Sequence, residues 1–250
     1  MKNIALITGS STGIGSGIVK HLSEKGFECI ITYNKNKNAG ERLLRDVSNS
    51  ENNHLLQKLD VCSEESVKNM SELIKEKYEK LDLLVCNAGV DYGIEIEKCT
   101  FKNWQEATRT KIDGAFLCTQ YLTPLLKKSN NANIIYISAS LAQKPDPYDP
   151  AYSCACAAVE NFGKSMAIAL SKYRIRTNVV CPGPTKTELD YWKNIEKING
   201  DVWNKLEKGN PLKRITTPQD VAEVIEMLFD DKTNYLNGNV IYVNGGAHIL

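Results

Sequence analysis

The sequence predicts an α/β fold with one doubly wound parallel sheet of about seven strands and helices on both of its faces. Three observations predict it. Short apolar runs rich in β-branched residues recur along the chain, and longer segments with apolar residues at three- and four-residue intervals lie between them. A glycine-rich turn directly follows the first apolar run. Such an alternation places the active crevice at the carboxyl ends of the strands.

The elements follow one another in a regular order. The segments 64–78 and 218–229 have the spacing of amphipathic helices, and the polar stretch "NKNKNAG" is a short loop. Residues 186–210 form the least regular part. The apolar runs that we predict as strands are residues 3–8, 28–33, 55–61, 81–87, 133–138, 176–182 and 239–244.

Length and charge narrow the class of protein. A chain of 250 residues can bury a large core, and we expect a single domain over residues 1–250. Lys and Arg total 31 against 30 acidic residues, so no general field favours nucleic acid or an anionic membrane. The first apolar run is too short for a signal sequence or a membrane span. We therefore expect a soluble cytoplasmic protein.

The eight cysteines do not indicate a metal site. They are scattered singly except for Cys154 and Cys156, and no C-x-x-C or Cys/His cluster has the spacing of a zinc site. Two residues apart on a helix, Cys154 and Cys156 point to different sides. We expect most of the cysteines to be small buried residues in a reducing compartment.

The glycine-rich turn, residues 8–18, predicts a phosphate site. Gly9, Gly13 and Gly15 permit a tight turn and close backbone approach. A pyrophosphate could then lie over the amino end of the following helix, where free N–H groups and the helix dipole favour anions. The strand before the turn and the helix after it indicate a Rossmann-type dinucleotide site, with Ser11, Thr12 and Ile14 in the same turn.

Motifs along nearly the whole chain resemble those of the classical short-chain dehydrogenase/reductase (SDR) family. The glycine turn matches T-G-x-x-x-G-x-G, and "PLKRITTPQDVAEVIEMLF" and "NGNVIYVNGG" resemble the family's last helix and strand. The resemblance implies a homotetramer or homodimer and a substrate lid over residues 186–210, where Tyr191, Trp192 and Trp203 could form an apolar wall. It assigns cofactor binding to Gly9, Ser11, Thr12, Gly13, Ile14, Gly15, Tyr33, Asn34, Lys35, Asp60, Val61, Asn87, Ala88, Gly89, Tyr152, Pro182, Gly183, Thr185 and Thr187.

The end of the second predicted strand favours NADP(H) over NAD(H). An NAD enzyme of this kind would carry an acid there, which would bind the ribose 2′-hydroxyl and repel a 2′-phosphate. The strand instead ends at Tyr33 and continues with Asn34 and Lys35, with no acid nearby. A solvated lysine-rich loop is the alternative, and Thr12 stands where many NADP-using relatives carry arginine.

The resemblance places one catalytic residue of the usual type, Tyr152, in an altered site. Cys156 takes the place of the lysine in Tyr-x-x-x-Lys, Lys111 that of the helix asparagine, and Ala139 that of the serine. A free tyrosine has a pKa of about 10, and a neighbouring ammonium favours its phenolate. A thiol, with a reference pKa near 8.5, supplies no such charge at neutral pH.

Two supporting residues are hypotheses. Ser140 becomes the donor to the substrate oxygen if the loop is shifted by one residue, whereas strand geometry would turn Ser138 and Ser140 away from whatever Ala139 faces. Lys111 could bring its ammonium to the space left at Cys156, or it could point to solvent. The predicted catalytic residues are therefore Tyr152, Ser140 and Lys111.

Two functions remain open. The first is an NADP(H)-dependent oxidoreductase that interconverts a carbonyl and an alcohol on a small-molecule or carrier-bound substrate, with Tyr152 as acid and base. The second is a degenerate or repurposed protein that binds the cofactor but serves as a scaffold, a regulatory partner or a non-redox catalyst. Fold resemblance does not separate them, because function depends on the site and this site has changed.

Overall fold

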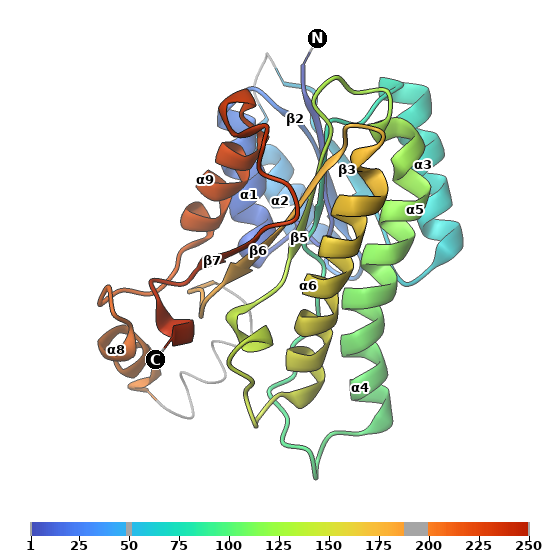
Figure 1. The fold of residues 1–250 in the computed structure, drawn as a ribbon. Coiled ribbons are helices and arrows are strands. Elements are labelled where there is room, and N and C mark those ends of the chain that lie inside the picture. Colours follow the sequence, from blue (N-terminus) through green and yellow to red (C-terminus); the bar gives the residue numbers. More distant parts are fainter. Residues whose placement is uncertain (1, 49–51, 188–199, 250) are drawn as a thin grey trace.

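A computed structural model describes residues 2–48, 52–187 and 200–249 of the chain. In these residues one sheet of seven strands has the order β3-β2-β1-β4-β5-β6-β7 (Figure 1). Every neighbouring pair of strands is parallel. The order reverses direction between β1 and β4, which is the position where doubly wound folds bind their ligands. The predicted fold class is confirmed.

The elements have the following bounds. The strands are β1 Ile4–Ile7, β2 Glu28–Tyr33, β3 Leu55–Lys58, β4 Leu83–Cys86, β5 Asn133–Ile137, β6 Arg176–Pro182 and β7 Val240–Val243. The α-helices are α1 Gly13–Glu24, α2 Lys37–Val47, α3 Glu64–Tyr78, α4 Phe101–Thr108, α5 Gly114–Leu126, α6 Pro150–Ser171, α8 Val202–Gly209 and α9 Pro218–Phe229. The short helical turns are η1 Arg109–Asp113, η2 Ser140–Ala142, η3 Asp231–Thr233 and η4 Ala247–Ile249.

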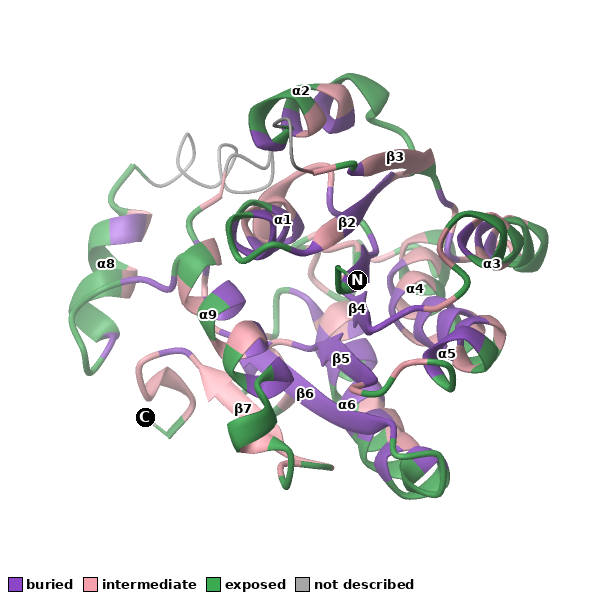
Figure 2. Ribbon diagram, turned by 90° about the horizontal axis from the view of Figure 1, so that it is seen from above, coloured by how far each residue is buried: buried purple, intermediate pink, exposed green. Residues whose placement is uncertain are grey.

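The helices cover the sheet in two layers. Helices α1, α2 and α9 lie on one face, and α3, α5 and α6 lie on the other (Figures 1 and 2). Each layer closes its own hydrophobic core, in which Ile18 of α1 and Ile225 of α9 are buried on one side and Met70 of α3 and Leu122 of α5 on the other. Because both faces are covered, the central strands are buried along their whole length and consist almost entirely of apolar residues (Figure 2).

The observed strands are shorter than five of the seven predicted runs, and the runs 55–61 and 81–87 lose the most residues. The run 81–87 forms a strand only from Leu83, and the buried carboxylate of Asp82 just before it accepts a hydrogen bond from the backbone N–H of Ile4, at 2.8 Å. The run 55–61 leaves the sheet after Lys58. The apolar pattern of the sequence predicted which segments form the sheet, but not the residues at which the pairing between strands ends.

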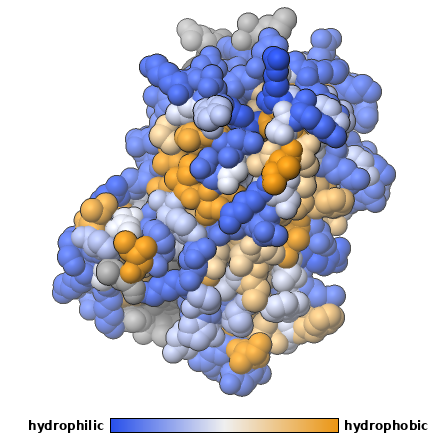
Figure 3. All heavy atoms as spheres, in the orientation of Figure 1, coloured by the Kyte–Doolittle hydropathy of each residue, from blue (hydrophilic) through white to orange (hydrophobic). Residues whose placement is uncertain are grey.

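The face of the molecule in Figure 3 is mostly hydrophilic, with hydrophobic residues in smaller groups. Within residues 2–48, 52–187 and 200–249, no helix is both long and apolar enough to cross a membrane. Those residues also contain no group of three or more His, Cys, Asp or Glu side chains that could hold a metal ion.

Candidate active site

Thr8 joins the glycine-rich turn to the segment that follows β4. Its hydroxyl oxygen accepts hydrogen bonds from the backbone N–H groups of Asn87 and Ala88, both at 2.9 Å. In return, the Asn87 side-chain amide donates to the carbonyl of Thr8 at 2.9 Å and to that of Gly9 at 3.2 Å. Two motifs that lie far apart in the sequence therefore form one rigid edge at the carboxyl ends of β1 and β4.

Gly9 is required by both conformation and space. Its φ is +62°, in the left-handed region that favours glycine. A Cβ atom built on it would lie 3.0 Å from the Cα of Ala88, closer than ordinary contacts allow. The turn therefore keeps its backbone exposed to a ligand instead of covering it with a side chain.

The amino end of α1 is open to an anion. Its N-cap residue, Thr12, makes no side-chain hydrogen bond to the helix. By contrast, the N-cap side chains of α2, α3, α4, α6 and α9 each accept a backbone N–H. The free N–H groups at the start of α1 and the helix dipole thus suit a phosphate in the position where the sequence predicts one.

The loop after β2 offers one unpaired lysine. The side chain of Asn36 caps α2, and the ammonium of Lys37 lies 3.4 Å from the carboxylate of Glu41. Lys35 is exposed and makes no ion pair with any residue in the described part of the chain. Across the cofactor edge, Asp60 accepts a hydrogen bond from the backbone of Cys62 at 3.0 Å, which fixes its carboxylate after β3.

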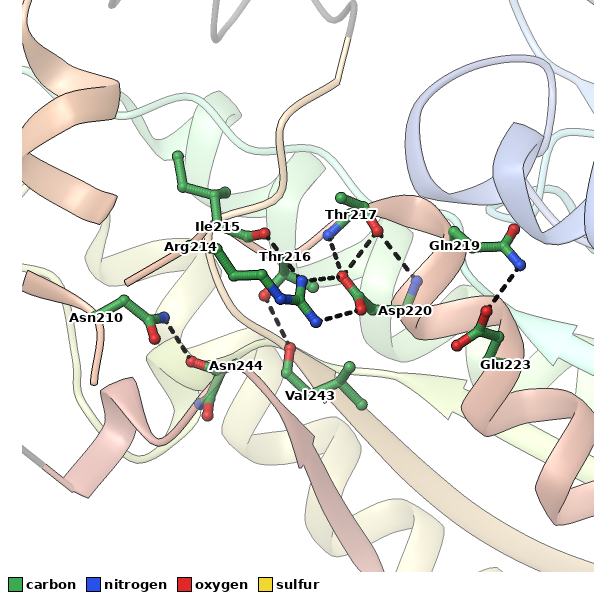
Figure 4. Close-up of polar contacts among 10 residues, drawn as sticks. All are labelled: Asn210, Arg214, Ile215, Thr216, Thr217, Gln219, Asp220, Glu223, Val243 and Asn244. Carbon is green, nitrogen blue, oxygen red and sulfur yellow. Dashed lines mark hydrogen bonds and ion pairs between the residues drawn. The ribbon is translucent and has the colours of Figure 1, made fainter. Parts of the chain in front are cut away.

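The end of β6 and the segment after it contain four of the predicted cofactor residues, Pro182, Gly183, Thr185 and Thr187. Gly183 donates a backbone hydrogen bond to Val243 at 3.1 Å, and Thr185 forms a parallel β-bridge with Thr216. Figure 4 shows how the loop before α9 is tied to the end of β7, with the Thr216 hydroxyl 3.0 Å from the carbonyl of Val243. The hydroxyl of Thr187 is buried and has no hydrogen-bond partner among the described residues.

Lys111 points inward from a widened helical turn. It lies in the π-helical turn η1 between α4 and α5 and is only 3% exposed. Its ammonium is 5.3 Å from the centre of the Tyr152 ring and would lie 3.1 Å from a Cβ atom on Gly89. The structure thus brings Lys111 to Tyr152 and to Gly89, and the alternative in which Lys111 points to solvent is wrong.

The Lys111 ammonium is an isolated buried charge. Burial lowers the pKa of Lys111 below its ordinary value, and the nearby Cys156, Cys181 and Asp91 oppose this only in part. Within the described part of the chain, no side chain hydrogen-bonds to it or forms an ion pair with it. A buried cation without a partner is costly, so this group suits a ligand that supplies an acceptor.

Tyr152 lies in the first turn of α6. Asp149 caps this helix by accepting the backbone N–H of Tyr152 at 3.2 Å, and Pro150 follows in the first turn. Burial raises the pKa of Tyr152 well above its ordinary value, and the neighbouring Cys156 and Asp91 raise it further. Tyr152 is therefore a neutral phenol at pH 7 in the ligand-free protein.

Cys156 lies one turn farther along α6 and is fully buried. Burial raises its pKa, while the neighbouring Lys111, Tyr152 and Ser138 lower it by less. The thiol is therefore neutral at pH 7. Cys154 is exposed, so the prediction that the two cysteines point to different sides is confirmed.

The two candidate serines differ in their contacts. The Ser138 hydroxyl is 3.1 Å from the backbone carbonyl of Cys156 and 3.3 Å from the carboxylate of Glu160. Ser140 begins the turn η2, and its buried hydroxyl makes no hydrogen bond to a described residue. Ala139 between them is extended, with φ of −155°.

Three acidic residues near the site are missing from the sequence prediction. Asp149 holds the loop before α4 by accepting the backbone N–H of Gly93 at 3.2 Å. Burial and a hydrogen bond with Asp149 raise the pKa of Asp91 to about 8. Glu160 is 4% exposed within α6. The sequence did contain a signal for Glu160, because Tyr152, Cys156 and Glu160 are spaced at four-residue intervals and so share one helix face.

The substrate end is described only in part. Tyr191 and Trp192 of the predicted lid lie outside the described residues, as does most of the segment 186–210. Trp203, on α8, is 9% exposed and therefore packs against the fold. The predicted apolar wall stays a prediction.

The described residues fit a dinucleotide cofactor. The glycine turn presents bare backbone, the amino end of α1 lacks a side-chain cap, and the orphaned Thr187 hydroxyl and Lys111 ammonium lie on segments at the same edge of the sheet. Each is a group that a phosphate, ribose or nicotinamide amide could satisfy.

Comparison with known proteins gives the same picture. The family model described as enoyl-(acyl carrier protein) reductase matches residues 9–248. A short-chain type dehydrogenase/reductase of Picea abies is 29% identical over 252 residues, covering 97% of this chain and 91% of that protein.

Two solved structures share the whole fold. The NADP active-site complex of Pseudomonas aeruginosa RhlG superposes with a TM-score of 0.89 and 26% identity, covering 98% of this chain and 96% of the other. The 3-ketoacyl-(acyl-carrier-protein) reductase of Brucella melitensis, complexed with NADH, gives a TM-score of 0.87 and 25% identity, covering 98% of each chain.

Proposed function

The chain belongs to the classical short-chain dehydrogenase/reductase family of oxidoreductases, and we propose that it reduces a ketone on a small or carrier-bound substrate with NADPH. The observation that carries this proposal is the isolated Lys111 ammonium, 5.3 Å from the ring of Tyr152 and adjacent to Gly89. A phenol and a cation at the cofactor edge are the two groups that carbonyl reduction needs from the protein.

The proposed cofactor residues are those of the sequence prediction. The glycine turn and the start of α1 would hold the pyrophosphate, and Asp60 and Val61 would lie at the adenine. Lys35 would face the 2′-phosphate, which supports NADP(H) over NAD(H), since no acid at the end of β2 would repel it. Asn87, Ala88, Thr185 and Thr187 would line the nicotinamide half. Bound NADPH would supply the hydride for the carbonyl carbon.

Tyr152 would act as the proton donor. Because its pKa is raised well above the ordinary value, the phenol is protonated at neutral pH, which is the form that reduction requires. Lys111 would stabilise the phenolate left after the transfer, in the role that the resemblance assigns to the lysine replaced by Cys156. Ser140 would donate to the carbonyl oxygen, a role supported by the engagement of Ser138 with α6.

Single-turnover kinetics test this function. Stoichiometric protein and NADPH are mixed with a panel of ketones and carrier-bound 3-oxoacyl thioesters, and loss of reduced nicotinamide absorbance is followed. We expect transfer with at least one substrate and none with Tyr152→Phe. Tight NADPH binding without transfer to any substrate would instead favour the second function, a binding protein in which Tyr152 no longer reacts.

The assembly is also proposed from the resemblance. We expect a homodimer or homotetramer, measured by sedimentation of the full chain. We further propose that residues 1–250 act as one dinucleotide-binding domain, with residues 186–210 as the segment that closes over the substrate.

A further inference from the structure

Lys111 and Tyr152 lie on different helices, so local helix geometry does not fix the distance between them. Tyr152 is on α6, whereas Lys111 is on η1, which continues directly from α4. A lysine four residues after the tyrosine would be held on the same face by the helix itself. With Cys156 at that position, the 5.3 Å between the Lys111 ammonium and the centre of the Tyr152 ring depends on how α4 and α6 are held together.

One backbone segment, after β4, lies against both groups. A Cβ atom built on Gly89 would lie 3.1 Å from the Lys111 ammonium and 3.5 Å from the Cε2 atom of the Tyr152 ring. Three and four residues later, the same segment reaches Tyr92 and Gly93. A displacement of this segment therefore changes the surroundings of the ammonium and of the ring together.

Asp149 ties this segment to the helix that carries the tyrosine. Its side chain is buried, with 4% of the residue exposed. One carboxylate oxygen accepts the backbone N–H of Tyr152 at 3.2 Å. The other accepts the backbone N–H groups of Tyr92 at 3.3 Å and Gly93 at 3.2 Å. The arrangement needs a carboxylate, because an asparagine at this position would offer only one acceptor oxygen.

Tyr92 ties the same segment to the helix that leads to the lysine. Its hydroxyl donates a hydrogen bond to the carboxylate of Glu106. Glu106 lies on α4, five residues before Lys111. Helices α4 and α6 lie side by side (Figure 1). The hydrogen bonds of Asp149 and Tyr92 therefore form one connection from α6 through residues 92–93 to α4, which we call the interhelical bridge.

We propose that Asp149 is a positioning residue that, through the interhelical bridge with Tyr92, holds the Lys111 ammonium at its working distance from Tyr152. The inference rests on the proposed function. Asp149 transfers no proton and touches neither substrate nor cofactor in this scheme. The bridge supplies, between two helices, the restraint that one helix provides when the tyrosine and the cation are four residues apart.

Two variants break the bridge at different points. In Asp149→Ser, the hydroxyl still caps α6, because serine is a good N-cap residue, but its short side chain cannot also hold residues 92–93. Tyr92→Phe leaves Asp149 in place and removes only the bond to Glu106. Both variants should therefore fold, while each releases α6 from α4 on one side of the segment.

Steady-state reduction of the substrate found in the single-turnover screen gives the first measurement. A displacement of about 1 Å in a catalytic group can cost about a hundredfold in rate, so we expect kcat to fall about tenfold in each variant for a smaller displacement. KM should stay unchanged, because the bridge acts on the catalytic pair. Tyr148→Phe, at a position 59% exposed in the loop before α6, is the matched control and should change neither constant.

A double-mutant cycle with Lys111→Met separates positioning from general damage, with single-turnover hydride transfer as the readout. Once the ammonium is gone, there is nothing left for the bridge to position, so Asp149→Ser and Tyr92→Phe should cause no further loss in Lys111→Met.

Three results would overturn the proposal while leaving the proposed function intact. The first is a tenfold loss that persists in Lys111→Met, which would show damage unrelated to the ammonium. The second is an unchanged kcat in both single variants. The third is a rise in KM at constant kcat, which would show that residues 92–93 bind the substrate directly. Absence of hydride transfer in the wild type would refute the proposed function, and the role of the bridge with it.

Discussion

Replacing Lys111 by methionine should lower the catalytic rate while leaving the free energy of unfolding equal or higher. The Lys111 ammonium lies 5.3 Å from the centre of the Tyr152 ring, and a unit charge at that separation is worth about 3 kcal/mol at an effective dielectric constant of about 20. Loss of this stabilisation of the phenolate corresponds to a fall in kcat on the order of a hundredfold. Steady-state reduction of the substrate found in the single-turnover screen measures it.

The stability of the same variant should not fall. Methionine fills a similar volume without a buried charge, so we expect the free energy of unfolding to stay equal or to rise by about 1 kcal/mol. The folded pKa of Lys111 lies below its ordinary value of 10.5, so the unfolded chain binds more protons in the interval between them. The gain from Lys111→Met is therefore full below the lowered pKa and disappears as the pH approaches 10.5, which urea denaturation at several pH values can follow.

The pH profile of activity gives an independent check. Activity that needs the protonated ammonium declines as the pH rises through the lowered pKa of Lys111, whereas Lys111→Arg should keep its charge and lose this alkaline decline. Lys102→Met, at an exposed position on α4, is the matched control and should change neither activity nor the pH profile. Unchanged turnover and unchanged cofactor affinity in Lys111→Met would refute the reasoning.

Three other changes follow from the structure. Cys156→Lys should place a second ammonium beside Lys111 and abolish most activity, and adding Lys111→Asn should restore it; a gain of activity in the single variant would indicate a decayed site instead. Lys35→Glu should weaken NADPH binding about tenfold in calorimetry, with little effect on NADH, and equal losses for both would exclude a 2′-phosphate contact. Asp220→Ala removes the capping box of α9 and the 2.7 Å ion pair with Arg214 (Figure 4), so the free energy of unfolding should fall by about 1 kcal/mol. Because its bonds with Arg214 hold the pKa of Asp220 at about 2, below its ordinary value of 3.8, this stabilisation is present above pH 3.8 and is lost as the pH falls toward 2.

Local sequence was sufficient wherever a short segment determines its own structure. The glycine turn was recognisable because only a residue without a side chain accepts the left-handed φ of Gly9 and its contact with Ala88. The start of α6 at Pro150 is likewise local, because its capping residue, Asp149, is adjacent. Strand ends were less predictable, since pairing depends on partners elsewhere, as Asp82 and Ile4 illustrate.

The sequence by itself thus determined the fold class, the family and the edge of the sheet at which the cofactor residues gather, because those depend on patterns within a few residues. Only the tertiary structure decided that the Lys111 ammonium turns inward to Tyr152, since this direction depends on a π-helical turn packed against α6. It also decided that Glu160 meets the Ser138 hydroxyl after β5 and the Cys181 thiol of β6, because side chains on different strands become neighbours only when the sheet is assembled.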